Sequence, residues 1–319
     1  MAGLDILEIL SPGIHTSVQD LGRYGYGRYG VAPSGALDTF ALRVANLLVG
    51  NTQDRAGLEA MLMGPAIRAL EDIVVAITGG NFQPLQNKQP IEMWRSHVFK
   101  KNDILSFGSN LSGFRAYIAV AGGIRVPSIM GSRSTNLSSR FGGFQGRVVG
   151  KRDILACEND SRYPRSATRR LRADLIPSYP THWLLRVIWG PQDDHFPDES
   201  QHAFLNETYR MSPDSDRTGI RLEGAAIRQK SEIPASIISE GVIAGSVQIP
   251  GDGKPIIILG ETVSGGYRKI ATVISADLPL LGQMKPGDTV EFSAVSLDEA
   301  RAALVVLEEK IRALENDMK

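Results

Sequence analysis

The sequence predicts a mainly β protein with a few helices, arranged as two domains. Its 319 residues include 33 Gly and 17 Pro, a content that favours short strands joined by tight turns. Several runs rich in β-branched residues have the length of single strands. The chain length itself suits two domains of roughly 150 residues each.

The strands are predicted from apolar runs and from a recurring turn. Runs with the length and composition of strands cover residues 73–78, 114–120, 184–188 and 255–259. A turn followed by Asp and an apolar pair recurs in both halves, at residues 101–105, 151–155 and 286–290. This repeat is typical of small barrels, and an old duplication is one interpretation of it. The strand-like run 153–157 contains the single cysteine, Cys157, which we interpret as a small buried hydrophobic residue.

Two helices are predicted from their start and stop signals. Residues 36–49 carry Asp38 in the first turn, repeat apolar residues on one face and end at Gly50. The second helix begins after Ser296, with Glu299 completing a capping box, and carries a heptad-like apolar stripe. That stripe either packs on its own domain or docks another protein of a complex.

A polar stretch at residues 159–179 predicts the domain boundary. It is rich in Arg, Ser, Asp and Pro and has little apolar periodicity, which is typical of a linker. The predicted parts are therefore an N-terminal β-barrel domain at 1–165, a C-terminal β-barrel domain at 166–295 and a C-terminal helix at 296–319.

Composition limits the classes of partner and compartment. Lys plus Arg and Asp plus Glu are both 35, so no net charge attracts nucleic acid or an anionic membrane surface. No apolar stretch approaches the roughly 20 residues that span a bilayer. The first residues lack a signal peptide pattern, and one cysteine suits a reducing compartment. We therefore expect a cytoplasmic protein.

Common catalytic and cofactor motifs are absent from the sequence. It contains no GxxxxGK[ST] phosphate loop and no GxSxG elbow. The glycine-rich residues 22–30 lack the spacing and the βαβ context of a dinucleotide fingerprint. The five histidines form neither HxH nor HExxH pairs, so we expect no metal site. Lys285, in Met284-Lys285-Pro286, lies in a predicted turn and not in a biotin-attachment site.

Four segments combine glycine with charged or amide side chains. Glycines let backbone N–H groups approach a ligand, and arginine offers a planar fork for carboxylate, phosphate or ureido oxygen. Together they indicate the binding of a small anionic or amide ligand. The segments are 16–23 with 32–38, 131–136 with 141–147, 239–241 with 245–250, and 265–272.

These segments, in this order, resemble the allophanate hydrolase subunit 2 or biotin-dependent carboxyltransferase-like family. That family includes the C subunit of bacterial 5-oxoprolinase, the carboxyltransferase part of urea carboxylase and a sporulation-kinase regulator. The resemblance runs from about residue 9 to residue 297. It also includes residues 58–59, 78–82, 215–219 and 274–278.

The resemblance implies a fold, an activity and partners. The implied fold is a pair of tandem cyclophilin-like β-barrels. The implied activity is that of the C subunit in an ATP-dependent 5-oxoprolinase-type complex, which hydrolyses a lactam or amide such as 5-oxoproline. The implied partners are an allophanate hydrolase subunit 1-like protein, which corresponds to the B subunit of 5-oxoprolinase, and a protein similar to the A subunit of that enzyme. The implied cofactor is ATP, which this chain or a partner binds, or which the two share.

Two other functions stay open. One is a carboxyltransferase component that moves CO2 from carboxybiotin to a urea-like amide; it needs a separate carrier, because this chain has no covalently attached biotin. The other is a non-catalytic regulator that binds a kinase inhibitor, for which the C-terminal helix matters more than the pocket.

The resemblance and the chemistry of the side chains together give the expected site residues. The expected catalytic residues are Lys269, which stabilises developing negative charge, and Asp38 and Glu240, which act as acid or base. The expected substrate-binding residues are Gln19, Arg23, Ser34, Arg133, Gln248 and Tyr267.

The chain departs from the family pattern at a few positions. Many members have Pro where this chain has Arg268, and Asp where it has Asn81 and Asn136. We expect Arg268 to place an additional cation near the site, which favours a more acidic substrate.

Overall fold

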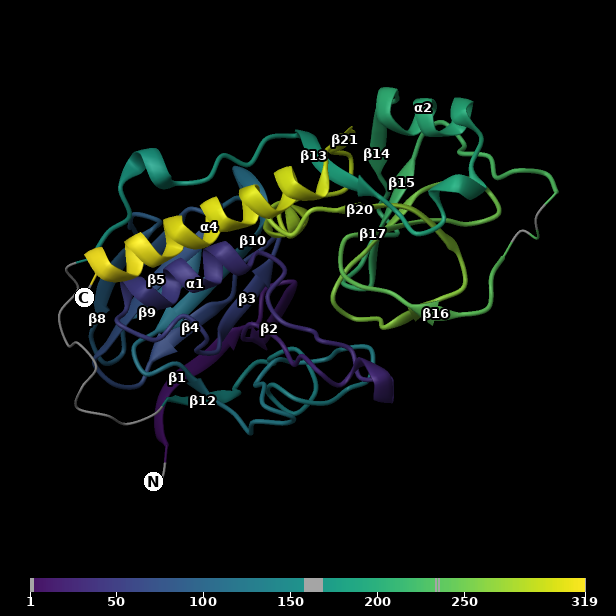
Figure 1. Cartoon of the computed structure of the whole chain (residues 1–319). Coiled ribbons are helices and arrows are strands. Elements are labelled where there is room, and N and C mark those ends of the chain that lie inside the picture. Colours follow the sequence, from purple (N-terminus) through teal and green to yellow (C-terminus); the bar gives the residue numbers. More distant parts are fainter. Residues whose placement is uncertain (1–2, 158–168, 233, 235, 319) are drawn as a thin grey trace. The chain divides into compact units, whose positions relative to one another are not determined.

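A computed structural model of the chain describes residues 3–157, 169–232, 234 and 236–318 (Figure 1). The chain divides into two compact units. The first comprises Met1–Arg23, Ser34–Tyr179 and Lys310–Lys319, and the second comprises Tyr24–Pro33 and Pro180–Glu309. The predicted boundary between residues 165 and 166 lies outside the described residues. Of the predicted linker, residues 169–179 belong to the first unit.

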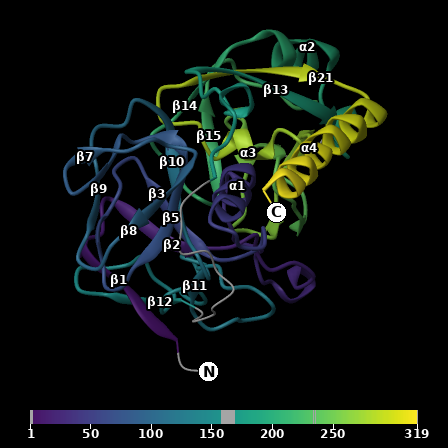
Figure 2. The ribbon, with the colours of Figure 1, turned by 90° about the vertical axis from the view of Figure 1, so that its left-hand side faces the viewer.

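The first unit contains two sheets, whose strands are joined by tight turns. One sheet has seven strands in the order β11-β12-β1-β4-β9-β6-β7. The other has five strands in the order β2-β3-β10-β5-β8, which lie side by side in Figure 2. The bounds are β1 Leu4–Ser11, β2 His15–Gln19, β3 Gly57–Met61, β4 Ala66–Ala69, β5 Ile73–Asn81, β6 Pro84–Gln86, β7 Gln89–Pro90, β8 Arg95–Phe99, β9 Ile104–Phe107, β10 Ser112–Val120, β11 Ile124–Arg125 and β12 Ile154–Cys157.

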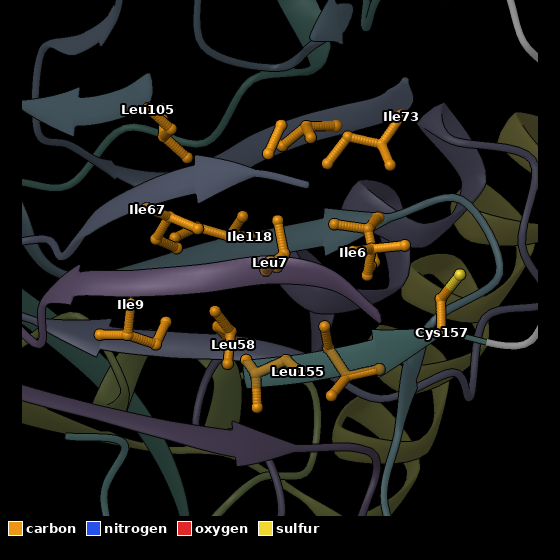
Figure 3. Close-up of a cluster of buried hydrophobic side chains, with 14 of the residues drawn as sticks. Ile6, Leu7, Ile9, Leu58, Ile67, Ile73, Leu105, Ile118, Leu155 and Cys157 are labelled. Atoms are coloured by element: carbon orange, nitrogen blue, oxygen red, sulfur yellow. The ribbon is translucent and has the colours of Figure 1, made fainter. Parts of the chain in front are cut away.

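The core of the first unit contains buried side chains from both sheets. Figure 3 shows Leu7 of β1 and Leu155 of β12 in the same apolar cluster as Leu58 of β3 and Ile118 of β10. All four are almost completely buried, and burying a side chain of this size stabilises a fold by about 1.5–3 kcal/mol. Cys157 lies in this cluster, so its interpretation as a buried hydrophobic residue is confirmed.

Helix α1 (Thr39–Leu48) packs against β5 and β10 of the five-stranded sheet (Figure 1). The predicted helix is confirmed, but it begins three residues later than predicted. Ser34 and Gly35 have positive φ angles, which are not helical, and Asp38 is the N-cap. The helix therefore starts only where the Asp38 side chain accepts a hydrogen bond from the Ala41 amide.

The second unit contains a closed barrel. Its strand order is β13-β20-β17-β18-β15-β14-β21, and β13 closes the ring by pairing with β21 in parallel, from His182 opposite Thr289 to Val187 opposite Ala294. The strand bounds are β13 His182–Trp189, β14 Tyr209–Met211, β15 Gly219–Glu223, β17 Ser246–Ile249, β18 Ile256–Ile258, β20 Arg268–Val273 and β21 Thr289–Ala294. A separate two-stranded ribbon pairs β16 (Glu240–Gly241) with β19 (Ser264–Gly265).

The remaining helices are short, except for the last. They are η1 Gly27–Tyr29, η2 Ala173–Leu175, η3 Asp193–His195, α2 Asp198–Asn206, α3 Leu278–Leu281 and α4 Leu297–Asp317. The predicted capping box of α4 is confirmed, because the Glu299 amide donates to the Ser296 hydroxyl and the Ser296 amide donates to the Glu299 carboxylate. Within the first unit, Ile311 of α4 is buried and the Lys310 ammonium lies 5.0 Å from the centre of the Phe40 ring.

The predicted mainly β architecture is confirmed, and a closed barrel is present in the second unit. The predicted strands correspond to β5, β10, β13 and β18, and the three Asp-containing turns precede β9, β12 and β21.

Candidate functional site

The sequence-predicted site residues fall into one group in each unit. The second unit contains Glu240, Gln248, Tyr267 and Lys269, and the first contains Gln19, Arg23, Ser34, Asp38 and Arg133.

In the second unit, Lys269 of β20 forms an ion pair with Glu240 of β16. The Lys269 side chain is only 7% exposed, whereas that of Glu240 is 44% exposed. A lysine held out of solvent needs a compensating charge, and here the carboxylate supplies it. The hydrogen bond from Lys269, followed by one from Gln192, lowers the pKa of the Glu240 carboxyl group below its ordinary value. The pair therefore presents an ionised carboxylate to solvent at neutral pH.

Gln248 and Tyr267 lie close to this ion pair. Gln248 of β17 is the cross-strand partner of Lys269, and its Nε2 donates to the Tyr267 carbonyl oxygen over 3.3 Å. Gly265, which pairs with Glu240 in the small ribbon, packs directly on this amide. A Cβ at position 265 would lie 2.4 Å from Gln248 Nε2, so a larger residue there would displace the Gln248 amide. The structure thus brings Glu240, Gln248 and Lys269 together, with the backbone carbonyl of Tyr267 next to the Gln248 amide.

Arg268 has a different surrounding from the one we expected. Successive residues of a strand point to opposite faces, so Arg268 and Lys269 leave β20 in opposite directions. Arg268 is 2% exposed, and its guanidinium donates to His195 Nδ1 over 2.8 Å. It also donates to Gln229 Oε1 over 2.6 Å and to the Pro234 carbonyl oxygen. These hydrogen bonds connect the loop after β15 to the barrel, so we do not assign the Arg268 guanidinium to the binding of a more acidic substrate.

In the first unit, Arg23 is buried against the segment formed by residues 131–147. Its guanidinium donates to the Ser34 hydroxyl over 3.2 Å and to the Ser134 carbonyl oxygen, and it lies 4.6 Å from the centre of the Phe141 ring. Gln19 Nε2 donates to the Thr135 carbonyl oxygen over 3.2 Å. Gln19, Arg23 and Ser34 therefore hold this glycine-rich segment in place.

Asp20 organises the same segment, although the sequence patterns did not single it out. Its carboxylate accepts hydrogen bonds from the Gly22 amide over 2.8 Å and the Ser132 hydroxyl over 2.7 Å. It also accepts from the Ser134 hydroxyl and the Arg133 amide. Alternating hydroxyl residues at 132 and 134 were the available signal, but their partner lies more than 110 positions away. The Arg133 side chain itself donates from Nε to the Val126 carbonyl oxygen over 3.3 Å.

Asp38 lies in a buried network at the start of α1. Its Oδ1 accepts from the Ala41 amide over 2.9 Å, and its Oδ2 accepts from the Tyr179 hydroxyl over 3.0 Å. Its own amide donates to the Tyr117 hydroxyl, which in turn donates to Glu59 over 2.7 Å. Burial raises the pKa of the Tyr117 phenol well above its ordinary value, and the Glu59 carboxylate raises it further. Tyr117 therefore stays protonated and remains a donor.

The two groups differ in the chemistry that they offer. The first-unit residues are buried, except for the half-buried Arg133, and they form hydrogen bonds with other protein groups, so they fix the segment 131–147 and the start of α1. The second-unit pair places a cation beside an exposed carboxylate, which can stabilise negative charge and accept a proton. Over the described part of the chain, no three His, Cys, Asp or Glu side chains gather in a way that could hold a metal ion. None of the helices in the described residues is long and apolar enough to cross a membrane.

Comparison with known sequences gives relatives of matching length. The sequence profile described as carboxyltransferase domain, subdomain A and B, matches residues 29–294. The protein named as the C subunit of 5-oxoprolinase in Haemophilus influenzae is 32% identical over 299 residues, which cover 93% of each chain. The protein of that name in Escherichia coli K12 is 35% identical over 303 residues, covering 93% of this chain and 94% of its own length.

Solved structures of larger proteins contain the same fold. Kluyveromyces lactis urea carboxylase superposes with a TM-score of 0.92 at 32% identity, covering 98% of this chain and 29% of that protein. The K. lactis urea amidolyase structure gives the same TM-score and identity, with 98% of this chain and 20% of that protein covered. The chain thus spans less than a third of these two proteins but nearly the full length of the two bacterial relatives.

Proposed function

The chain belongs to the carboxyltransferase domain, subdomain A and B, family, and from this membership we propose that it is one subunit of an ATP-dependent 5-oxoprolinase-type complex. In this proposal the complex hydrolyses a lactam or amide such as 5-oxoproline. The observation that carries the proposal is the end-to-end match with two relatives named as the C subunit of 5-oxoprolinase. That name also motivates partners that are similar to the A and B subunits of such an enzyme.

The reaction needs negative charge to be stabilised on the amide oxygen. ATP transfers its terminal phosphoryl group to that oxygen, water attacks the amide carbon, and the C–N bond then breaks with loss of phosphate. We assign Lys269 to the charge that develops on the oxygen or phosphoryl group. Glu240, ionised and exposed, is assigned to accept a proton from the attacking water.

The other residues are assigned to orientation of the substrate. Gln248 and Tyr267 lie beside the ion pair and are assigned to hydrogen bonds with the amide. Gln19, Arg23, Ser34 and Arg133 act through the segment 131–147 in the first unit. Asp38 stays a candidate acid or base, although both of its carboxylate oxygens already accept a hydrogen bond. In this proposal ATP is bound by a partner protein or is shared between the partner and this chain.

Reconstitution with the partner proteins tests the proposal. The full chain, mixed with purified A and B subunits, is expected to support ATP hydrolysis that depends on 5-oxoproline. Lys269→Met is expected to lower kcat by about 100-fold or more, because it removes a group that stabilises the transition state. Lys254→Met, at an exposed position of the same unit, is the matched control. Absence of turnover with every component present would reject the proposal.

One observation favours a second candidate, the carboxyltransferase component. The fold superposes on both urea-processing proteins over nearly the whole of this chain. This function needs a separate biotin carrier. It predicts that the chain transfers radiolabelled CO2 from carboxybiotin to urea or a similar amide in the absence of ATP. Transfer without any 5-oxoproline-dependent ATP hydrolysis would favour this candidate over the first.

A further inference from the structure

We propose that Gln192 is a positioning residue, whose side-chain amide fixes Glu240 and Lys269 in one arrangement. Taking the pair as reacting groups rests on the proposed function, but the hydrogen bonds of Gln192 do not. Its Nε2 donates to Glu240 Oε1 over 2.7 Å, and its Oε1 accepts from the Lys269 backbone amide over 3.1 Å. Each end of a single amide thus contacts one member of the pair.

The loop that carries Gln192 is anchored directly on β20. The Gly190 amide donates to the Ile270 carbonyl oxygen over 2.8 Å. A Cβ at Gly190 would lie 2.2 Å from the Lys269 carbonyl oxygen, so the backbones touch here. Because the loop cannot move without breaking these contacts, the Gln192 amide is held at a fixed distance from Lys269.

The same short segment also contacts the other face of β20. His195, three residues after Gln192, accepts the hydrogen bond from Arg268 Nε, and its carbonyl oxygen accepts from the Lys230 amide. Residues 192–195 therefore contact two successive residues of one strand, through the Lys269 backbone and the Arg268 side chain. These contacts fix the β20 backbone at the base of the Lys269 side chain.

A neutral amide suits this position better than a carboxylate does. Glutamine can donate to Glu240 and accept from an amide at the same time, whereas an ionised glutamate can only accept. Lys269 of β20 is the charged group with the largest effect on the pKa of Glu240. The other titratable groups on the segment after Gln192 are Asp193, Asp194 and His195 of η3. The ribbon partner β19 contributes only Ser264 and Gly265. The hydrogen bond from Lys269 lowers the pKa of Glu240 most, and the hydrogen bond from Gln192 lowers it further.

The first test measures the Glu240 carboxyl group directly in the full chain. Its pKa is followed by NMR of 13C-labelled glutamate, with Glu240→Gln identifying the signal. Gln192→Ala and Gln192→Glu are expected to raise this pKa by about half a unit or more, because a hydrogen bond to the ionised form is lost. Gln201→Ala is the control, since its side chain bonds the Asp193 carbonyl oxygen of the same loop but neither member of the pair. An unchanged pKa in folded Gln192→Ala, or an equal shift in Gln201→Ala, would overturn the inference.

The second test uses the reconstituted complex. Gln192→Ala is expected to lower kcat by about 10- to 100-fold with little change in KM, because a reacting pair is misplaced and not lost. The acid limb of its pH–rate profile is expected to shift to higher pH, because the pKa of Glu240 is raised. If the NMR shift occurs but the wild-type complex lacks 5-oxoproline-dependent ATP hydrolysis, the proposed function fails and the positioning role stands. If the wild type is active and Gln192→Ala changes neither kcat nor the pH profile, the positioning role alone fails.

Discussion

Two substitutions at Asp38 separate the contribution of its charge from its contribution as the N-cap of α1. Asn removes the charge and keeps the cap, whereas Ala removes both. Asp38→Ala removes the cap of α1, which costs about 1 kcal/mol, and removes the partner of the half-buried Tyr179 hydroxyl, which costs about 1 kcal/mol more. The expected total is about 2 kcal/mol. Asp38→Asn keeps a capping oxygen for Ala41, and its NH2 group can donate to the Tyr179 oxygen. Its expected cost is below about 1 kcal/mol.

Hydrogen exchange of the α1 backbone measures this difference where it arises. Since 1.4 kcal/mol corresponds to tenfold, Asp38→Ala is expected to reduce the protection of α1 amides by about 30-fold and Asp38→Asn by less than about fivefold. Equal losses in the two variants would refute the reasoning, because the carboxylate charge and not the cap would then hold the helix. Because Asp38→Asn keeps the fold, its activity reports the chemistry of the carboxylate alone. A catalytic acid or base at this position predicts a loss of about 100-fold or more.

Two further predictions concern one buried and one exposed group. Tyr117→Phe is expected to lower the free energy of unfolding by about 3 kcal/mol in urea titrations, because Glu59 loses a donor and the Asp38 amide loses its acceptor. Tyr29→Phe, at an exposed position, is the control and should lower it by less than about 0.5 kcal/mol. The pKa of Glu240 is lowered in the folded state, so the stability it contributes is present above the unfolded value of about 4.3 and is lost as the pH falls through the folded value. Between about pH 5 and pH 3 the wild type is therefore expected to lose more stability than Glu240→Gln, and parallel losses in urea titrations would contradict the ion pair.

Local sequence patterns predicted some of the elements, among them β5, β10, β13 and β18 and the helices α1 and α4. The apolar runs of β5, β10 and β13 and the capping box of α4 depend on neighbouring residues, and each was predicted close to its observed place. Asp38 was expected inside the first turn of α1 and is its N-cap instead. Two residues whose side chains connect distant parts of the sequence were missed. Gln192 lies 77 positions before Lys269, and Asp20 lies more than 110 positions before the serines it accepts from. No periodicity in the sequence encodes such pairs.

Arg268 shows why a chemically reasonable expectation from the sequence needed a structure. A guanidinium next to Lys269 in sequence was expected near the substrate. Strand alternation places it on the opposite face, where it meets His195 and Gln229. Its neighbour Lys269 was predicted to belong to the site from the same segment, and the structure brings it to Glu240. Adjacent positions in one strand can therefore have unrelated functions.

The parallel seam between β13 and β21 sets the order in which the second unit can be completed during synthesis. His182 and Thr289, which pair across the seam, are 107 positions apart in the chain. At about 5–20 residues per second, β13 waits roughly 5–20 s for the strand that closes the ring. During that interval the edge of β13 that will pair with β21 has no partner and is available to other chains. The other edge of β13 pairs with β20, the strand that carries Lys269. The barrel that holds the ion pair is therefore closed only when translation has nearly reached α4.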